Sequence, residues 1–318
     1  MMTLAQMACA VLNTADGREK TALSRGFAAQ WSTARAAGDD VEIGTCSPPD
    51  MPARPKAPEL RAPRDVPRRK TGSIEGRNAL LHAVAHIELN AVDLHWDLIA
   101  RFSHIQMPLG FYDDWVKAAD EESKHFNLMC DCLEAHGSFY GAMPAHAGMW
   151  RAAQDTQSDF LGRLAVVPMV LEARGLDVTP GMIRIFENAE DTQVVAALNV
   201  IYAEEVAHVA YGSKWFHFLC GRDDLDPKPF FIASCASISM ALSNHLSTKK
   251  NVPRQGSHPI FTGPSPMKCR HHRRCDRVCE QKQADLSEYK GFASIKFVAA
   301  DWSFGYSVRK DTALGGPL

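Results

Sequence analysis

The chain carries two matching sets of potential metal ligands, and their order constrains the fold more than any other feature. Each set is a lone glutamate followed, 34 or 33 residues later, by a Glu-x-x-His motif; the six residues are Glu88, Glu122, His125, Glu172, Glu205 and His208. Residues three apart on an α-helix lie on one face, so both side chains of a motif can reach one metal centre. This repeat of a helical hairpin predicts a four-helix bundle whose interior holds two iron or manganese ions.

Apolar residues at helical spacing predict where the four helices lie. The expected ranges are about 74 to 103, 111 to 136, 151 to 174 and 190 to 220. Residues 138–150 are expected to form a crossover connection, and Gly175 is expected to end the third helix. Because no convincing strand pattern lies between the helices, the sequence predicts an all-α fold.

The segments on either side of the bundle differ from it in composition. Residues 1–35 have the spacing of two short helices that separate at Asp16-Gly17, and residues 47–67 contain seven prolines, which predict an extended strap. We therefore divide the chain into N-terminal helices and strap (1–72), a four-helix bundle (73–231) and an irregular extension (232–318). The extension has no core pattern and is expected to be poorly ordered.

Charge and hydropathy exclude some classes of partner. The net charge of −2 and the pI near 6.7 give no overall basic field for nucleic acid or an anionic membrane. No export signal is recognisable at the N-terminus, and no run of 18 apolar residues predicts a membrane span. We therefore expect a cytoplasmic protein whose nine cysteines are reduced thiols.

The ligand types indicate which metal the predicted site prefers. Four carboxylates with only two imidazoles favour iron, with manganese as the alternative, over a thiolate-seeking zinc. We expect Glu122 and Glu205 to bridge the two ions and Glu88 and Glu172 to be terminal ligands. Each ion then receives one histidine.

Other ionisable residues lie near the predicted ligands along the chain. Three histidines of the first bundle helix are expected to be satisfied in the core or to support the ligands, with direct ligation as the alternative: His82, His86 and His95. Glu121 and Glu204 each precede a ligand and point about 100° away from it, so they are expected to be solvated or to support a ligand. Asp191 is a further candidate for supporting a ligand histidine.

The extension holds a second group of potential ligands. Cys269, Cys275 and Cys279 lie close to His271 and His272, but their spacing fits no standard zinc finger. A structural zinc site here is therefore the less favoured interpretation.

The residues around the two motifs resemble a known superfamily. Segments 72–94, 121–126, 144–150, 170–181 and 204–208 together resemble the ferritin-like di-iron carboxylate superfamily. More narrowly, they resemble a mostly bacterial ferritin-like family designated a domain of unknown function. The resemblance extends to about Phe231, and the 87 residues after it resemble nothing we can name.

This resemblance implies a metal site more firmly than a reaction, since fold does not settle function. Superfamily members include tRNA-modifying and quinone-biosynthetic hydroxylases, peroxidases and ferritins. Our leading hypothesis is an oxygen-dependent oxidoreductase, a hydroxylase or monooxygenase of a small organic or tRNA-nucleoside-like substrate. The chain has no nucleotide-binding fingerprint, so its electrons are expected from an external donor. The alternatives are a ferroxidase or metal-handling protein without an organic substrate, and a bundle with a structural metal or none.

Overall fold

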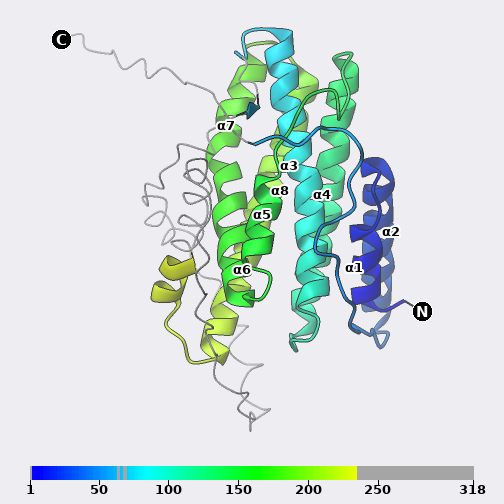
Figure 1. Cartoon of the computed structure of the whole chain (residues 1–318), viewed down its shortest axis with the longest axis vertical. Helices are drawn as coiled ribbons and strands as arrows, with labels where there is room; N and C mark the ends of the chain where they lie inside the picture. The colour runs from blue at the N-terminus through cyan, green and yellow to red at the C-terminus, as the bar shows by residue number, and fades with distance from the viewer. Residues whose placement is uncertain (1, 63–64, 67–69, 235–318) are drawn as a thin grey trace, which may run out of the picture.

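The computed structural model describes residues 2–62, 65–66 and 70–234, and these residues fold into a helical bundle (Figure 1). The predicted all-α class is confirmed: the described part of the chain contains one isolated β-bridge, Leu60–Ala145, and no strand. The helices in chain order are α1 (Leu4–Leu12), α2 (Gly17–Ala37), α3 (Ile74–Arg101), α4 (Leu109–Ala135), α5 (Gly148–Asp155), α6 (Phe160–Val166), the π-helix η2 (Val167–Glu172), α7 (Ala173–Glu187) and α8 (Thr192–Arg222).

Helix α3 is the centre of the bundle. Its N-cap is Ser73, whose side chain accepts a hydrogen bond from the backbone N–H of Gly76 at 3.2 Å. From Leu80 to Ala100 nearly every side chain of α3 is buried, because α4 packs along one side of it while α1, α2 and α5 contact the others. A helix buried on all sides can carry polar groups only where they have partners or a function.

Helices α5 and α6, the π-helix η2 and helix α7 together form the third wall of the bundle. They differ from the single helix expected at 151–174. Helix α5 stops at Asp155, and the Asp159 side chain caps α6 by accepting from Gly162 N at 2.8 Å. The chain then passes through η2 and continues helically to Glu187, so neither Gly175 nor Pro180 ends it. Packing of α7 along α8 outweighs the local preference of these two residues, as tertiary contacts commonly do.

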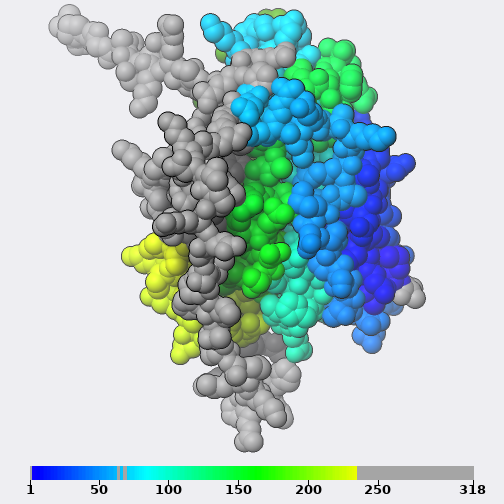
Figure 2. Space-filling view, in the orientation of Figure 1, coloured from blue at the N-terminus to red at the C-terminus, as the bar shows by residue number. Residues whose placement is uncertain are grey.

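The N-terminal helices and the strap lie against one side of the bundle. The described residues of the strap form no helix or strand among the named elements, and its Arg54 donates to the Asn90 side chain of α3 at 2.8 Å. Near its end, Arg61 N donates to the carbonyl of Ala145 at 2.8 Å. Figure 2 shows the blue residues of the strap beside the green residues of α5 on one face of the protein.

A disulfide joins Cys9 of α1 to Cys46 at the start of the strap, which corrects the expectation that all nine cysteines are reduced. The strap returns along α1, where the backbone N–H groups of Leu4 and Ala5 donate to Glu42 and Ile43 at 3.0 and 2.9 Å. The two cysteines are 37 residues apart, so only this tertiary packing brings them together. Among the described residues, Cys130, Cys132 and Cys220 are free and buried.

Helix α8 is long and apolar enough to cross a membrane, judged by length and composition alone. In the protein it packs against α4, α6, η2 and α7, and a buried bundle helix also meets this criterion. It is therefore weak evidence for a span, and the cytoplasmic location stays a prediction. The predicted disorder of the extension and its Cys269–Cys279 cluster lie outside the described residues.

Candidate metal centre

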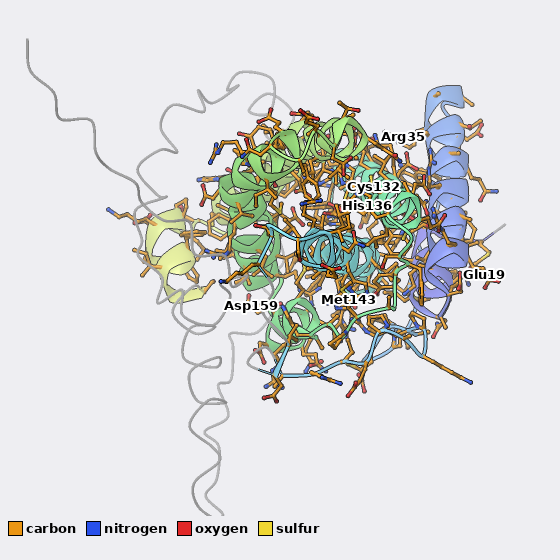
Figure 3. All side chains as sticks on the ribbon, turned by 90° about the horizontal axis from the view of Figure 1, so that it is seen from above. Glu19, Arg35, Cys132, His136, Met143 and Asp159 are labelled. Atoms are coloured by element: carbon orange, nitrogen blue, oxygen red, sulfur yellow. A yellow bond between two sulfur atoms is a disulfide. The ribbon has the colours of Figure 1, made fainter. Side chains whose placement is uncertain are left out.

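The four walls of the bundle bring all six predicted residues into one buried site. Glu88 lies on α3, Glu122 and His125 on α4, Glu172 at the end of η2, and Glu205 and His208 on α8. Each of the six is at most 8% exposed. In the view along the bundle (Figure 3), the side chains of these helices fill the interior, whereas α2, which carries the labelled Glu19 and Arg35, lies outside the bundle.

The site residues form two groups in which ligand atoms lie within 4.8 Å of one another. The first group contains Glu88, Glu122, His125 and Glu205, and the second contains His95, Glu172 and His208. Glu122 faces both groups: its Oε2 lies 3.4 Å from Nδ1 of His125, and its Oε1 lies 2.9 Å from Nδ1 of His208. A carboxylate in this place has the geometry of a bridge between two metal positions.

The π-helix positions the glutamate of the third wall. Its wider turn carries Glu172 into the interior, and π-helical turns in helices frequently occur at functional sites. Close contact with α8 is possible because residue 212 is glycine: a Cβ atom there would lie 2.4 Å from Cγ of Pro168. Gly212 follows His208 by one helical turn, so the two elements meet directly beside the site.

Polar atoms without partners test whether a metal fits here. Seven buried atoms of the cluster form no hydrogen bond: Glu88 Oε2, His95 Nε2, Glu122 Oε1, both carboxylate oxygens of Glu172, Glu205 Oε2 and His208 Nδ1. Buried polar groups are normally paired, and leaving one unpaired costs roughly 1–3 kcal/mol. Oxygen and imidazole nitrogen donors suit divalent cations such as iron and manganese, so the unpaired atoms fit a metal centre.

The crowded carboxylates shift one another's protonation. Burial, followed by the charge of Glu122, raises the pKa of Glu88 and raises that of Glu205 to about 6, and burial beside Glu205 raises the pKa of Glu172. Burial acts the same way on Glu122, but the nearby imidazoles of His125, His208 and His95 outweigh it and hold its pKa well below the usual value. Without cations, the site therefore retains protons that a metal would displace.

Two further glutamates orient the candidate ligand histidines across the α4–α8 interface. His125 of α4 hydrogen-bonds through Nε2 to Glu204 of α8 at 2.8 Å, and His208 of α8 hydrogen-bonds through Nε2 to Glu121 of α4 at 3.0 Å. In both cases Nδ1 is left facing the site. Glu121 and Glu204 are therefore not simply solvated: each contacts a candidate ligand histidine of the opposite helix, and such contacts orient metal ligands in known sites.

We expect Glu204→Gln to weaken metal binding without unfolding the protein. The amide cannot hold the His125 ring as the carboxylate does, and loss of such a supporting partner costs roughly 10–100-fold in metal affinity. Isothermal titration of the metal-free protein with Mn²⁺ measures the effect. The matched control is Glu187→Gln on the exposed end of α7. Equal affinities of the two variants would mean that Glu204 does not support the site.

The expectations for His95 and Asp191 have different outcomes. The satisfied-core part of the expectation does not hold for His95, which is 1% exposed and whose Nε2 has no hydrogen-bond partner; support of a ligand and direct ligation stay predictions. Asp191 does not support a predicted ligand, because it accepts from Nε2 of His136 at 2.7 Å and caps α8. The expectation of satisfied core residues holds for His86, which pairs with the Tyr140 hydroxyl, and for His82, which accepts from Gly141 N.

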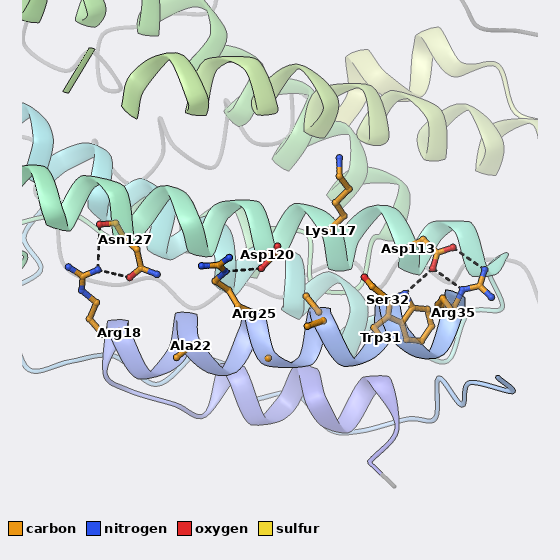
Figure 4. Close-up of a pocket in the computed structure, with 13 residues that line it drawn as sticks. Arg18, Ala22, Arg25, Trp31, Ser32, Arg35, Asp113, Lys117, Asp120 and Asn127 are labelled. Atoms are coloured by element: carbon orange, nitrogen blue, oxygen red, sulfur yellow. Dashed lines mark hydrogen bonds and ion pairs between the residues drawn. The ribbon is translucent and has the colours of Figure 1, made fainter. Parts of the chain in front are cut away.

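A surface groove lies between α2 and α4, away from the buried cluster (Figure 4). Arg25 pairs with Asp120 across it at 3.1 Å, and Arg35 pairs with Asp113 at 2.9 Å. None of the predicted metal residues lines this groove. Its cations are already paired with carboxylates of the same chain, so we do not assign the groove to the chemistry of the cluster.

Fold and site together define a helical bundle with a buried glutamate–histidine cluster that can hold metal. The chain belongs to the family described as "Protein of unknown function (DUF455)", whose profile matches residues 13–251. It is 43% identical over 187 residues to an uncharacterized protein of Haemophilus influenzae, and this match covers 57% of the chain and 65% of that protein. No solved structure matches the chain significantly.

Proposed function

We propose that the buried cluster holds two iron ions, with manganese as the alternative, and that the protein is an oxygen-dependent oxidoreductase of the ferritin-like type. The observation that supports this proposal is the convergence of seven unpaired buried donor atoms from four helical walls. Glu122, which faces both groups, and Glu205 are proposed as bridges. Glu88 and Glu172 are proposed as terminal ligands, and His125 and His208 bind one ion each.

The residues of the chain prepare the site for this chemistry. Glu121 and Glu204 hold the ligand histidines with Nδ1 toward the metal positions, and Lys117 and Lys124 pair with these outer carboxylates at 3.2 and 2.5 Å. Two iron ions held by these residues would supply electrons for the reduction of dioxygen, and an external donor would have to replace those electrons. The proposed substrate is a small organic or nucleoside-like molecule.

Apolar packing separates the site from water at both ends. On α4, Trp115 precedes the Glu122–His125 motif and Phe126 follows it; on α8, Ile201 precedes Glu205 and Trp215 follows His208. All four apolar side chains are at most 3% exposed. Exclusion of water strengthens electrostatic interactions in a site and protects reactive species from side reactions.

Metal analysis of protein purified without oxygen tests the proposal directly. We expect about two iron ions per chain and a change in the optical spectrum when oxygen is added. Bound iron that is oxidised without consumption of a reductant or an organic substrate would favour the metal-handling alternative. Absence of bound iron and manganese would overturn the proposal.

A further inference from the structure

His95 of α3 is buried and faces the cluster, but it is not among the six predicted ligands. The side chain of His95 is 1% exposed, and its Nε2 lies 3.6 Å from Oε1 of Glu172 and 3.7 Å from Oε1 of Glu122. Neither distance is a hydrogen bond, and Nε2 has no other partner. An imidazole nitrogen in this place is costly unless something else binds it.

The place of His95 on α3 explains which part of the site it can reach. It follows Glu88 by seven residues, which is about two helical turns along the same face. Glu88 belongs to the group with His125 and Glu205, whereas His95 belongs to the group with Glu172 and His208. One helix thus supplies a carboxylate to one metal position and an imidazole to the other.

Surrounding rings fix the orientation of this imidazole. The Trp115 ring lies 5.3 Å from that of His95 at an interplanar angle of 31°, and the His208 ring lies 5.7 Å away at 73°. His86, on another face of the same helix, has the opposite character: Nδ1 pairs with the Tyr140 hydroxyl at 2.8 Å and Nε2 with the His146 carbonyl at 3.0 Å. His86 is therefore a structural histidine, and His95 is not satisfied by the protein.

We propose that His95 is a seventh metal ligand and that it makes the two metal positions chemically unequal. The position near Glu172 receives two imidazoles, His95 and His208, whereas the position near Glu88 receives one imidazole, His125, in a carboxylate-rich setting. This inference rests on the proposed dinuclear centre. Imidazole suits the later first-row ions, and carboxylate suits manganese and magnesium. The two positions therefore fill in sequence, and Co²⁺ enters the two-histidine position first.

Stepwise titration with Co²⁺ tests whether the two metal positions differ in affinity. Metal-free wild type, His95→Gln and the matched control His86→Gln are titrated anaerobically and followed by the visible absorption of bound Co²⁺. We expect two resolved steps in the wild type and in the control. In His95→Gln the first step is expected to weaken by at least about 100-fold, since a direct ligand should matter no less than a supporting residue.

A measurement on the wild type keeps the test independent of variant folding. X-ray absorption at one equivalent of Co²⁺ is expected to show two imidazoles on the ion. One imidazole there, or an unchanged first step in folded His95→Gln, would overturn the role of His95 while leaving the dinuclear centre intact. A wild-type protein that binds no Co²⁺ would overturn both this inference and the proposed function.

Discussion

Replacing Glu122 by glutamine is expected to abolish metal binding at both positions. Glu122 is fully buried on α4, and its two oxygens face different groups: Oε2 lies near His125, and Oε1 lies near His208 and His95. A neutral amide cannot bridge two cations, so we expect affinity to fall by well over the roughly 100-fold that marks the loss of a supporting residue. Titration with Mn²⁺ and metal analysis after gel filtration measure the loss.

Thermal unfolding provides a second readout of the same variant. A ligand at 100 times its dissociation constant stabilises the folded state by about 2.7 kcal/mol, so metal should raise the midpoint of the wild type and leave that of Glu122→Gln unchanged. The control is Glu187→Gln on the exposed end of α7, because Glu187 belongs to neither metal group. If Glu122→Gln still bound about two ions, Glu122 would not be a bridge.

The six predicted residues could be found from the sequence because their spacing is local. The Glu-x-x-His motifs follow from helix geometry, and their repetition in two hairpins placed four walls around one site. The structure brings these residues together. The all-α class is confirmed, and metal binding by the residues stays a proposal.

The parts that sequence reasoning missed depend on contacts between distant segments. The pairing of Glu121 with His208 and of Glu204 with His125 crosses the α4–α8 interface, although the doubled Glu-Glu-x-x-His motif was a visible signal for it. His95 follows Glu88 by two turns, and a seven-residue spacing also occurs in ordinary core helices. The role that we propose for it rests on its unpaired nitrogen, which only the structure locates.

The third wall was missed for a different reason. Gly175 and Pro180 commonly end helices, yet α7 continues through both because α8 packs against it. The π-helical turn before it has no local signature that we recognise, and it is the element that carries Glu172. Sequence rules for helix ends therefore disagree with the structure in the segment formed by η2 and α7.

A buried ion pair outside the site is expected to dominate stability. Lys20 of α2 pairs with Asp93 of α3, and both side chains are at most 2% exposed. Lys20 also donates to the carbonyl of Ala53 in the strap at 3.0 Å. Lys20→Met leaves the Asp93 carboxylate buried without a counter-ion, and breaking such a pair on one side costs about 3–5 kcal/mol. In a protein of this size, the thermal midpoint should fall by roughly 10 °C.

Lys20→Met can lose stability because Asp93 is left without a counter-ion or because packing around residue 20 changes. The pH dependence of stability and two control variants distinguish these causes. Burial already raises the pKa of Asp93 despite the attraction of Lys20, and without Lys20 its folded-state pKa rises further above the unfolded value. The folded variant then binds the extra proton, so its deficit relative to wild type should grow as pH rises through that pKa and shrink in acid. Chemical denaturation at pH 5 and pH 8 measures this trend.

Removing both charges should recover much of the loss, since a buried pair can be replaced by apolar side chains at little cost. We therefore expect Lys20→Met combined with Asp93→Leu to be more stable than Lys20→Met alone. Arg25→Met, which breaks the exposed Arg25–Asp120 pair, should cost less than about 1 kcal/mol. A deficit in Lys20→Met that is independent of pH and persists in the double variant would show that packing, rather than the unpaired Asp93, sets the cost. Because Asp93 lies on α3 between Glu88 and His95, the pair also anchors the helix that carries these two residues of the proposed metal centre.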